Sequence, residues 1–167
     1  MAKCEEVDSF FTRIEGDFKD INYSLHCLVN NAGVYLGQSL FNYSSQEIDR
    51  VIDVNLKGLI YFTRFFVKSV WKESAKGIIV NIASVAGEFG SSDAIYALTK
   101  AGTLGMTKSN AMNLAPNIRV NAISPGLVHD TKIFDQIPKH RLEEYQRQEL
   151  LADKITPDPN FSQNIHE

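Results

Sequence analysis

The sequence predicts an α/β protein built on a doubly wound parallel sheet. Three short apolar runs of strand length alternate with long segments of helical periodicity, which gives the order strand, helix, strand, helix, strand. Crossovers of that length favour parallel pairing. Each run also ends in small or polar residues, and ligands of such sheets bind beyond the carboxyl ends of the strands.

The first half of the chain provides a helix, a strand and a second helix. Apolar residues recur at helical spacing over residues 7–21. Residues 25–29 form a mostly apolar run that ends in Asn-Asn-Ala-Gly, which suits a buried parallel strand. Ser44 and Glu47 have the spacing of a capping box, so a long helix should begin there and continue to about Val70.

The second half repeats the alternation. The run GIIVNIA over residues 77–83 predicts a strand, and residues 93–115 predict a helix that a Pro-Asn pair ends. Residues 118–124 predict a third strand, which Pro125 and Gly126 close. The three strand ends should therefore converge on one crevice.

Length, charge and cysteine content restrict the class of protein. The chain has 167 residues, 44% hydrophobic and 22% charged, as expected for one globular domain, which we place at 1–150 with a loosely ordered tail at 151–167. The net charge of −3 and the lack of a long apolar run argue against nucleic acid, membranes and a secretory signal. Cys4 and Cys27 have no metal-ligand spacing and form no disulfide framework, so we expect no metal and a reducing, cytoplasmic location.

Four residues near the predicted crevice could carry chemistry. Tyr96 and Lys100 lie one helical turn apart, either as a tether beside a surface cation or as a proton donor beside the charge that tunes it. Asn55 falls on the inward stripe of its helix, as a core amide satisfied by backbone or as a functional group. Ser84 ends the second strand, where it caps a turn or faces the crevice. Together at one sheet edge, the four favour an active site.

Several longer motifs accompany these residues. The chain contains LVNNAG, VNLKG and GIIVNIASVAG, a serine twelve residues before Tyr-x-x-x-Lys, and RVNAISPG. This ordered set, from about Glu5 to Thr131, closely resembles the short-chain dehydrogenase/reductase family, and most of all its classical members related to 3-oxoacyl-acyl-carrier-protein reductases. The resemblance implies a Rossmann-like fold and hydride transfer between NAD(H) or NADP(H) and a carbonyl or alcohol.

The resemblance also implies a role for each residue. Tyr96 would be the general acid or base, and Lys100 would lower the pKa of its phenol and bind the nicotinamide ribose. Ser84 would donate a hydrogen bond to the developing oxyanion, and Asn55 would hold a water that links Lys100 to solvent. The other cofactor contacts, beyond those of Tyr96 and Lys100, would come from Asn30, Gly33, Pro125, Gly126 and Val128.

The sequence departs from the family at the phosphate-binding loop. The Thr-Gly-x-x-x-Gly-x-Gly turn that holds the pyrophosphate in the family has no counterpart in the 167 residues, nor has the strand whose end selects NAD over NADP. We therefore expect an incomplete, N-terminally truncated sheet that lacks its first strands and binds cofactor weakly or not at all. NAD and NADP both stay open, as do a fatty-acyl thioester, a steroid and a small ketone as substrate.

Two functions follow from these features. The first is an NAD(P)-dependent oxidoreductase of a small carbonyl or alcohol, favoured by the intact set of four residues. The second is a non-catalytic chain that pairs with full-length relatives, favoured by the missing phosphate loop. The family commonly forms oligomers through the helices after Ser45 and around Tyr96, so a homo-oligomer is also expected. Residues 132–146 form either a lid, with apolar contacts from Ile133, Phe134 and Ile137, or a packed amphipathic segment.

Overall fold

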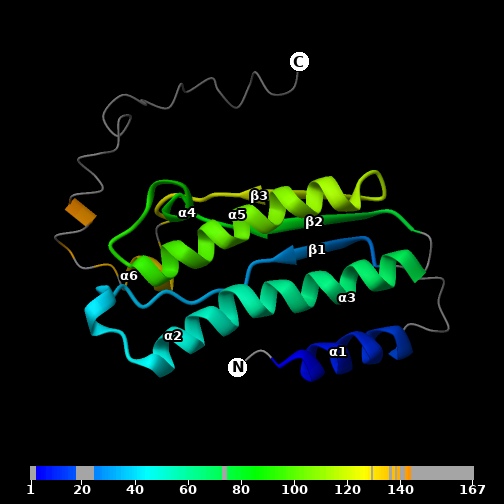
Figure 1. Ribbon diagram of the computed structural model, residues 1–167, viewed down its shortest axis with the longest axis horizontal. Helices are drawn as coiled ribbons and strands as arrows, with labels where there is room; N and C mark the ends of the chain where they lie inside the picture. Colours follow the sequence, from blue (N-terminus) through cyan, green and yellow to red (C-terminus); the bar gives the residue numbers. More distant parts are fainter. Residues whose placement is uncertain are drawn as a thin grey trace, which may run out of the picture.

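The sheet consists of three parallel strands. The computed structural model describes residues 3–17, 25–72, 75–128, 130–135, 137, 139 and 142–143. Strands β1 (Cys27–Asn30), β2 (Gly77–Ile82) and β3 (Ile118–Ile123) lie in that order, with their carboxyl ends at the side where α4 and α6 are found (Figure 1). The α/β class and the parallel pairing predicted from the sequence are confirmed.

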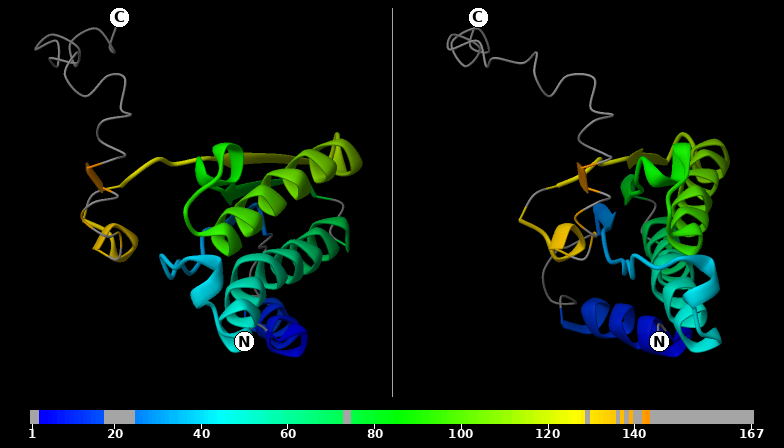
Figure 2. Two further views of the ribbon diagram at one scale, coloured as in Figure 1. Left: turned by 60° about the vertical axis from the view of Figure 1, so that its left-hand side comes forward. Right: turned by 90° about the vertical axis from the view of Figure 1, so that its left-hand side faces the viewer.

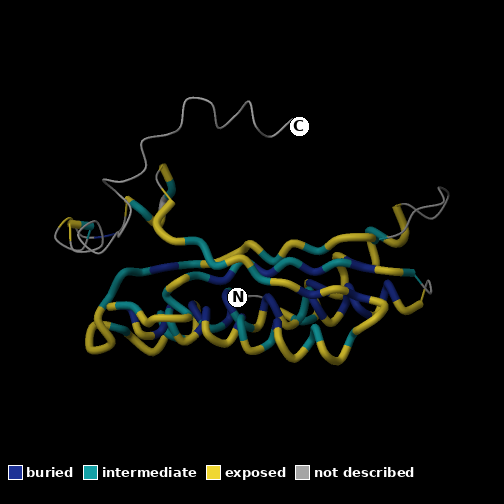
Figure 3. Tube along the Cα trace, turned by 90° about the horizontal axis from the view of Figure 1, so that it is seen from above, coloured by how far each residue is buried: buried dark blue, intermediate teal, exposed yellow. Residues whose placement is uncertain are grey.

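Helices α3 (Leu59–Lys72) and α5 (Ala94–Leu114) form a layer against one face of the sheet (Figures 2 and 3). Helix α3 contacts β1 and β2, α5 contacts β2 and β3, and α1 (Cys4–Asp17) packs on α3. The core between them is apolar, and its most deeply buried members are Phe66, Val70, Ile79 and Ile118. In the described residues the opposite face of the sheet is open, which leaves Val29 and Ile123 more than half exposed.

The helix after β1 is not regular throughout. Its start is confirmed as a capping box, because the Ser44 side chain accepts from the Glu47 amide and the Glu47 carboxylate accepts from the Ser44 amide. It runs from α2 (Ser45–Ile52) through a π-helical turn, η2 (Asp53–Gly58), into α3. π-helical turns are rare in proteins, but those that occur are often found at functional sites. This one holds Asn55 in the interior.

Three short helices lie outside the sequence-based expectations. The 3₁₀ helix η1 (Leu40–Asn42) precedes α2, α4 (Ala86–Phe89) follows β2, and α6 (Lys132–Asp135) follows β3. The expected helix at 7–21 is described only as far as residue 17, and the segment 132–146 only in part. The whole tail 151–167 lies outside the described residues. Among the helices that the structure describes, none has the length and apolar character that spanning a bilayer needs.

Candidate active site

The carboxyl ends of the strands surround a cavity of about 520 Å³. Seven of the nine residues singled out from the sequence line it: Gly33, Ser84, Tyr96, Lys100, Pro125, Gly126 and Val128. They come from the loops after all three strands and from α5, so the predicted convergence of the three strand ends is confirmed. Tyr35 and the apolar residues Ile133, Phe134 and Ile137 line the same cavity.

Tyr96 is placed by the first turn of α5. The helix begins after Asp93, whose carboxylate accepts a 2.9 Å hydrogen bond from the Tyr96 amide. The tyrosine is 8% exposed, and its ring packs edge-to-face on Tyr35 with the ring centroids 5.0 Å apart. The side chain of Ser84 is hydrogen-bonded to Tyr96, and the Ser84 oxygen also accepts from the Ala86 amide at 3.1 Å. Ser84 therefore both caps a turn and faces the site.

Lys100 is buried and held by the end of β2. Its ammonium donates a 2.7 Å hydrogen bond to the Ile82 carbonyl and lies 5.6 Å from the centroid of the Tyr96 ring. Burial lowers the pKa of the Lys100 ammonium below its ordinary value. An ammonium has three donors, and among the described residues Ile82 supplies one acceptor, so two N–H groups are available to a ligand in the cavity.

The phenol is harder to ionise than the sequence-based account requires. Burial raises the pKa of Tyr96, the hydrogen bond with Ser84 opposes that rise, and the charge of Asp93 adds to it. The lowering that we expected from Lys100 is not found. The physical reason is that the ammonium lies over the ring and bonds Ile82, while burial of the phenol dominates.

Asn55 is a fully used core amide. Its oxygen accepts from the Val34 amide at 2.8 Å, and its nitrogen donates to the Val34 carbonyl at 3.0 Å and to the Thr99 hydroxyl at 3.1 Å. These contacts fasten the loop after β1 to α5. The backbone-satisfied alternative describes this geometry, and the proposed water contact stays a prediction.

Gly33 lies between two of the polar groups. A Cβ atom added there would lie 3.5 Å from the Asn55 amide oxygen and 3.7 Å from the Lys100 nitrogen, which are ordinary contact distances. The lack of a side chain at Gly33 therefore keeps the cavity open beside Lys100, although the packing around Gly33 does not require a glycine.

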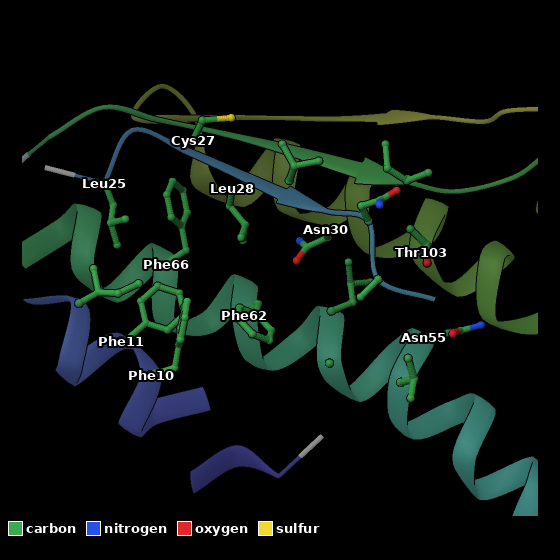
Figure 4. A pocket seen from close by; sticks show the side chains of 18 of the residues that line it. Phe10, Phe11, Leu25, Cys27, Leu28, Asn30, Asn55, Phe62, Phe66 and Thr103 are labelled. Atoms are coloured by element: carbon green, nitrogen blue, oxygen red, sulfur yellow. The ribbon is translucent and has the colours of Figure 1, made fainter. Parts of the chain in front are cut away.

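Asn30 serves a different part of the molecule. Its amide nitrogen donates to Thr63 at 3.1 Å and to Asn81 at 2.9 Å, and Asn81 donates in turn to Thr107, which builds a polar network between sheet and helices. Asn30 and Asn55 line a second cavity of about 400 Å³, walled by aromatic residues of α1 and α3 and by β1 (Figure 4). The predicted contact of Asn30 with the adenosine ribose stays a prediction.

Two residues that contact the backbone of Tyr96 and Lys100 were not found from the sequence. The Asp93 carboxylate also accepts from the Gly37 amide and the Tyr43 hydroxyl, which lie 56 and 50 positions earlier in the chain. A Cβ atom on Gly87 would lie 2.6 Å from the carbonyl carbon of Lys100, so this glycine lets α4 approach α5. An aspartate before a helix signals a cap, but no local pattern shows the longer contacts.

Comparison with known sequences identifies the relatives of this chain. The profile of the short chain dehydrogenase family matches residues 1–142. A 3-alpha-(or 20-beta)-hydroxysteroid dehydrogenase of Mycobacterium tuberculosis is 43% identical over 117 residues, which are 69% of this chain and 44% of that protein. A 3-oxoacyl-[acyl-carrier-protein] reductase of Thermotoga maritima is 42% identical over 118 residues, which are 70% of this chain and 47% of that protein.

Solved structures give the same result. An NAD+-bound xylitol dehydrogenase has a TM-score of 0.71 and 32% identity, covering 80% of this chain and 51% of the other. A 3-ketoacyl-(acyl-carrier-protein) reductase from Brucella melitensis complexed with NADH has a TM-score of 0.73 and 26% identity, covering 85% of this chain and 59% of the other. The chain spans about half the length of the relatives it matches. On its sequence and its fold, it belongs to the short chain dehydrogenase family.

Proposed function

We propose that this chain carries the catalytic half of an oxidoreductase that transfers hydride between NAD(P)(H) and a small-molecule carbonyl or alcohol. The observation that carries the proposal is the common cavity of Ser84, Tyr96 and Lys100 at the carboxyl ends of the strands. The family, its NAD+- and NADH-bound solved members and the hydroxysteroid and oxoacyl relatives support it.

Tyr96 would move the proton. Its raised pKa keeps the phenol protonated at neutral pH, which suits a donor to a carbonyl oxygen. Ser84, which is hydrogen-bonded to Tyr96, would donate to the same oxygen as negative charge develops on it. In the alcohol direction the same phenol would have to lose its proton first.

The residues present fit the nicotinamide end of the dinucleotide. The two free N–H groups of Lys100 suit ribose hydroxyls, and Gly33 leaves that part of the cavity open. Pro125, Gly126 and Val128 would form the wall beside the ring. When bound, NAD(P)(H) supplies or accepts the hydride. The 167 residues contain no Gly-rich phosphate turn, so we expect this chain alone to bind the dinucleotide weakly.

Tyr96→Phe tests the chemistry with the smallest change. We expect reduction of ketone substrates by millimolar NADPH or NADH to fall by at least about 100-fold, because a general acid contributes on that scale. Tyr61→Phe, the same change in the first turn of α3 and outside the residues that line the cavity, is the matched control and should leave the rate unchanged. Equal rates for Tyr96→Phe and the unmodified chain would refute the role of Tyr96.

A second candidate function is association with another subunit of the family. Trp71 and Ile60 on α3 are 54% and 44% exposed, and they share a groove with Met106 and Leu114 of α5. Exposed apolar side chains on two neighbouring helices are typical of an interface. Trp71→Lys should shift the sedimentation profile towards monomer, whereas Phe41→Lys, at an exposed aromatic residue of η1 outside that groove, should not. A monomeric unmodified chain would argue against this function.

A further inference from the structure

The Asp93 carboxylate is fully buried and joins three separate segments. It is 0% exposed. One oxygen accepts from the Tyr96 amide at 2.9 Å and the other from the Gly37 amide at 3.0 Å, while the Tyr43 hydroxyl lies 2.9 and 2.8 Å from the two oxygens. A helix cap needs only the contact with the Tyr96 amide. The contacts with the Gly37 amide and the Tyr43 hydroxyl therefore need a different explanation.

Only a carboxylate satisfies this set of donors. Three donor groups from three segments converge on two oxygens, and both oxygens accept. An asparagine has a single acceptor oxygen, so its NH₂ group would face the amide of Gly37 or of Tyr96. A serine could keep the bond to the Tyr96 amide but is too short to serve Gly37 and Tyr43 as well.

The loop that Asp93 holds also contacts the phenol ring. Val34 is fixed by the two hydrogen bonds with Asn55, and Gly37 is fixed by Asp93. Tyr35 lies between these two anchors and packs edge-to-face on Tyr96. Asp93 therefore holds the backbone of Tyr96 on one side and the loop that supports its ring on the other.

We propose that Asp93 is a positioning residue for Tyr96, which keeps the Tyr35 ring against the phenol through its bonds to Gly37 and Tyr43. The role in catalysis rests on the proposed oxidoreductase function, but the positioning itself does not. Among the described residues, the ionisable groups around Asp93 and Tyr96 are the Lys100 ammonium over the Tyr96 ring, the Tyr35 and Tyr43 phenols, and Glu47 near Tyr43.

Asp93→Ser separates positioning from capping. The serine retains the cap, so the chain should stay folded, with a circular dichroism spectrum like that of the unmodified chain. In nuclear Overhauser spectra of tyrosine-labelled protein, assigned with Tyr96→Phe and Tyr35→Phe, the contact between the two rings should be lost or reduced several-fold. Tyr96 should also titrate at lower pH, because a negative charge near the phenol is gone.

The two readouts distinguish charge from position. A lower titration midpoint with an unchanged contact between the Tyr35 and Tyr96 rings would overturn the proposal, since loss of charge alone gives that result. Tyr43→Phe keeps both the charge and the cap, and it should weaken the same ring contact to a smaller degree. Should Asp93→Ser fail to fold, an unchanged ring contact in Tyr43→Phe would be the overturning result.

Kinetics connect the inference to the proposed function. For any ketone that the chain reduces, Asp93→Ser should lower kcat by about 10- to 100-fold with KM changed by less than about twofold, as expected for a displaced acid. An unchanged kcat in Asp93→Ser would overturn the catalytic part. A different result is possible, in which Asp93→Ser loses the contact between the Tyr35 and Tyr96 rings but Tyr96→Phe is as active as the unmodified chain. That result would refute the oxidoreductase function and leave the positioning role in place.

Discussion

Lys100 lies over the ring of Tyr96, with its nitrogen 5.6 Å from the ring centroid and hydrogen-bonded to the Ile82 carbonyl at 2.7 Å. One turn of α5 separates the two residues, and the last residue of β2 supplies the acceptor. Both side chains are less than a tenth exposed. Burial favours the neutral form of each group, which raises the pKa of Tyr96 and lowers the pKa of Lys100.

Lys100→Met should separate stability from ligand binding. The variant loses one hydrogen bond but no longer buries an ammonium, so its free energy of unfolding should stay within about 1 kcal/mol of the unmodified value. Its affinity for NADPH should fall. Denaturant unfolding and cofactor titration measure the two effects. Lys108→Met, on an exposed position of the same helix, should change neither quantity, and equal affinities for both variants would contradict the role of Lys100.

Gly87→Ala should destabilise the junction between α4 and α5. The added Cβ would lie 2.6 to 2.8 Å from backbone atoms of Lys100 and Ala101, which cannot move without displacing the helix. Overpacking of this kind costs about 1–3 kcal/mol. Gly105→Ala in α5, the other helix of this junction, is the control, because nothing lies within 4 Å of a Cβ added there. That change should stabilise the chain by about 0.5–1 kcal/mol, and a loss of equal size in both variants would refute the packing argument.

Asn55→Ala should destabilise the chain, because Asn55 joins the loop after β1 to α5. The substitution removes three hydrogen bonds and leaves the partly buried amide of Val34 without its Asn55 partner, which costs about 1–3 kcal/mol of unfolding free energy. Thr99→Val removes one of the three and should cost less. Because the two side chains share a bond, the losses should not add in the double variant, and additive losses would contradict the coupling.

The pH dependence of stability should contain a contribution from Glu15. Hydrogen bonds from Lys72 and Ser69, at 3.0 and 2.9 Å, lower the pKa of this carboxyl below its ordinary 4.5. The carboxylate therefore stabilises the folded chain above about pH 4.5, and that stability is lost as the pH falls through the lowered pKa.

Glu15→Gln measures this contribution. The side chain is 39% exposed, so the variant should lose only about 0.5 kcal/mol at pH 7. Denaturant unfolding at several pH values should show the two proteins converging in acid. A difference that grows as the pH falls would have the wrong sign for this account.

Local sequence patterns predicted most of the sheet and the helices. The apolar run before Asn-Asn-Ala-Gly, the capping box at Ser44 and the proline after the long helix each gave an element within a few residues of its observed bounds. Convergence of the three loops also followed, because parallel strands bring their carboxyl ends to one edge.

The contacts that finish the site were not predictable in this way. The bonds of Asp93 to Gly37 and Tyr43 join residues 56 and 50 positions apart. The π-helical turn at Asn55 leaves the apolar periodicity almost unchanged. The direction of the Lys100 side chain depends on a strand carbonyl in β2, a contact between segments that no local pattern shows.

The most direct test of the account is a titration of the ¹⁵N-labelled chain with NADPH and NADH, followed by amide chemical shifts. We predict weak but saturable binding, with the shifts concentrated at Gly33, Ser84, Lys100 and Val128 and reduced in Lys100→Met. Shifts that are absent at millimolar cofactor, or that cluster away from the cavity at the ends of the strands, would contradict the claim that this edge of the sheet is a nicotinamide site.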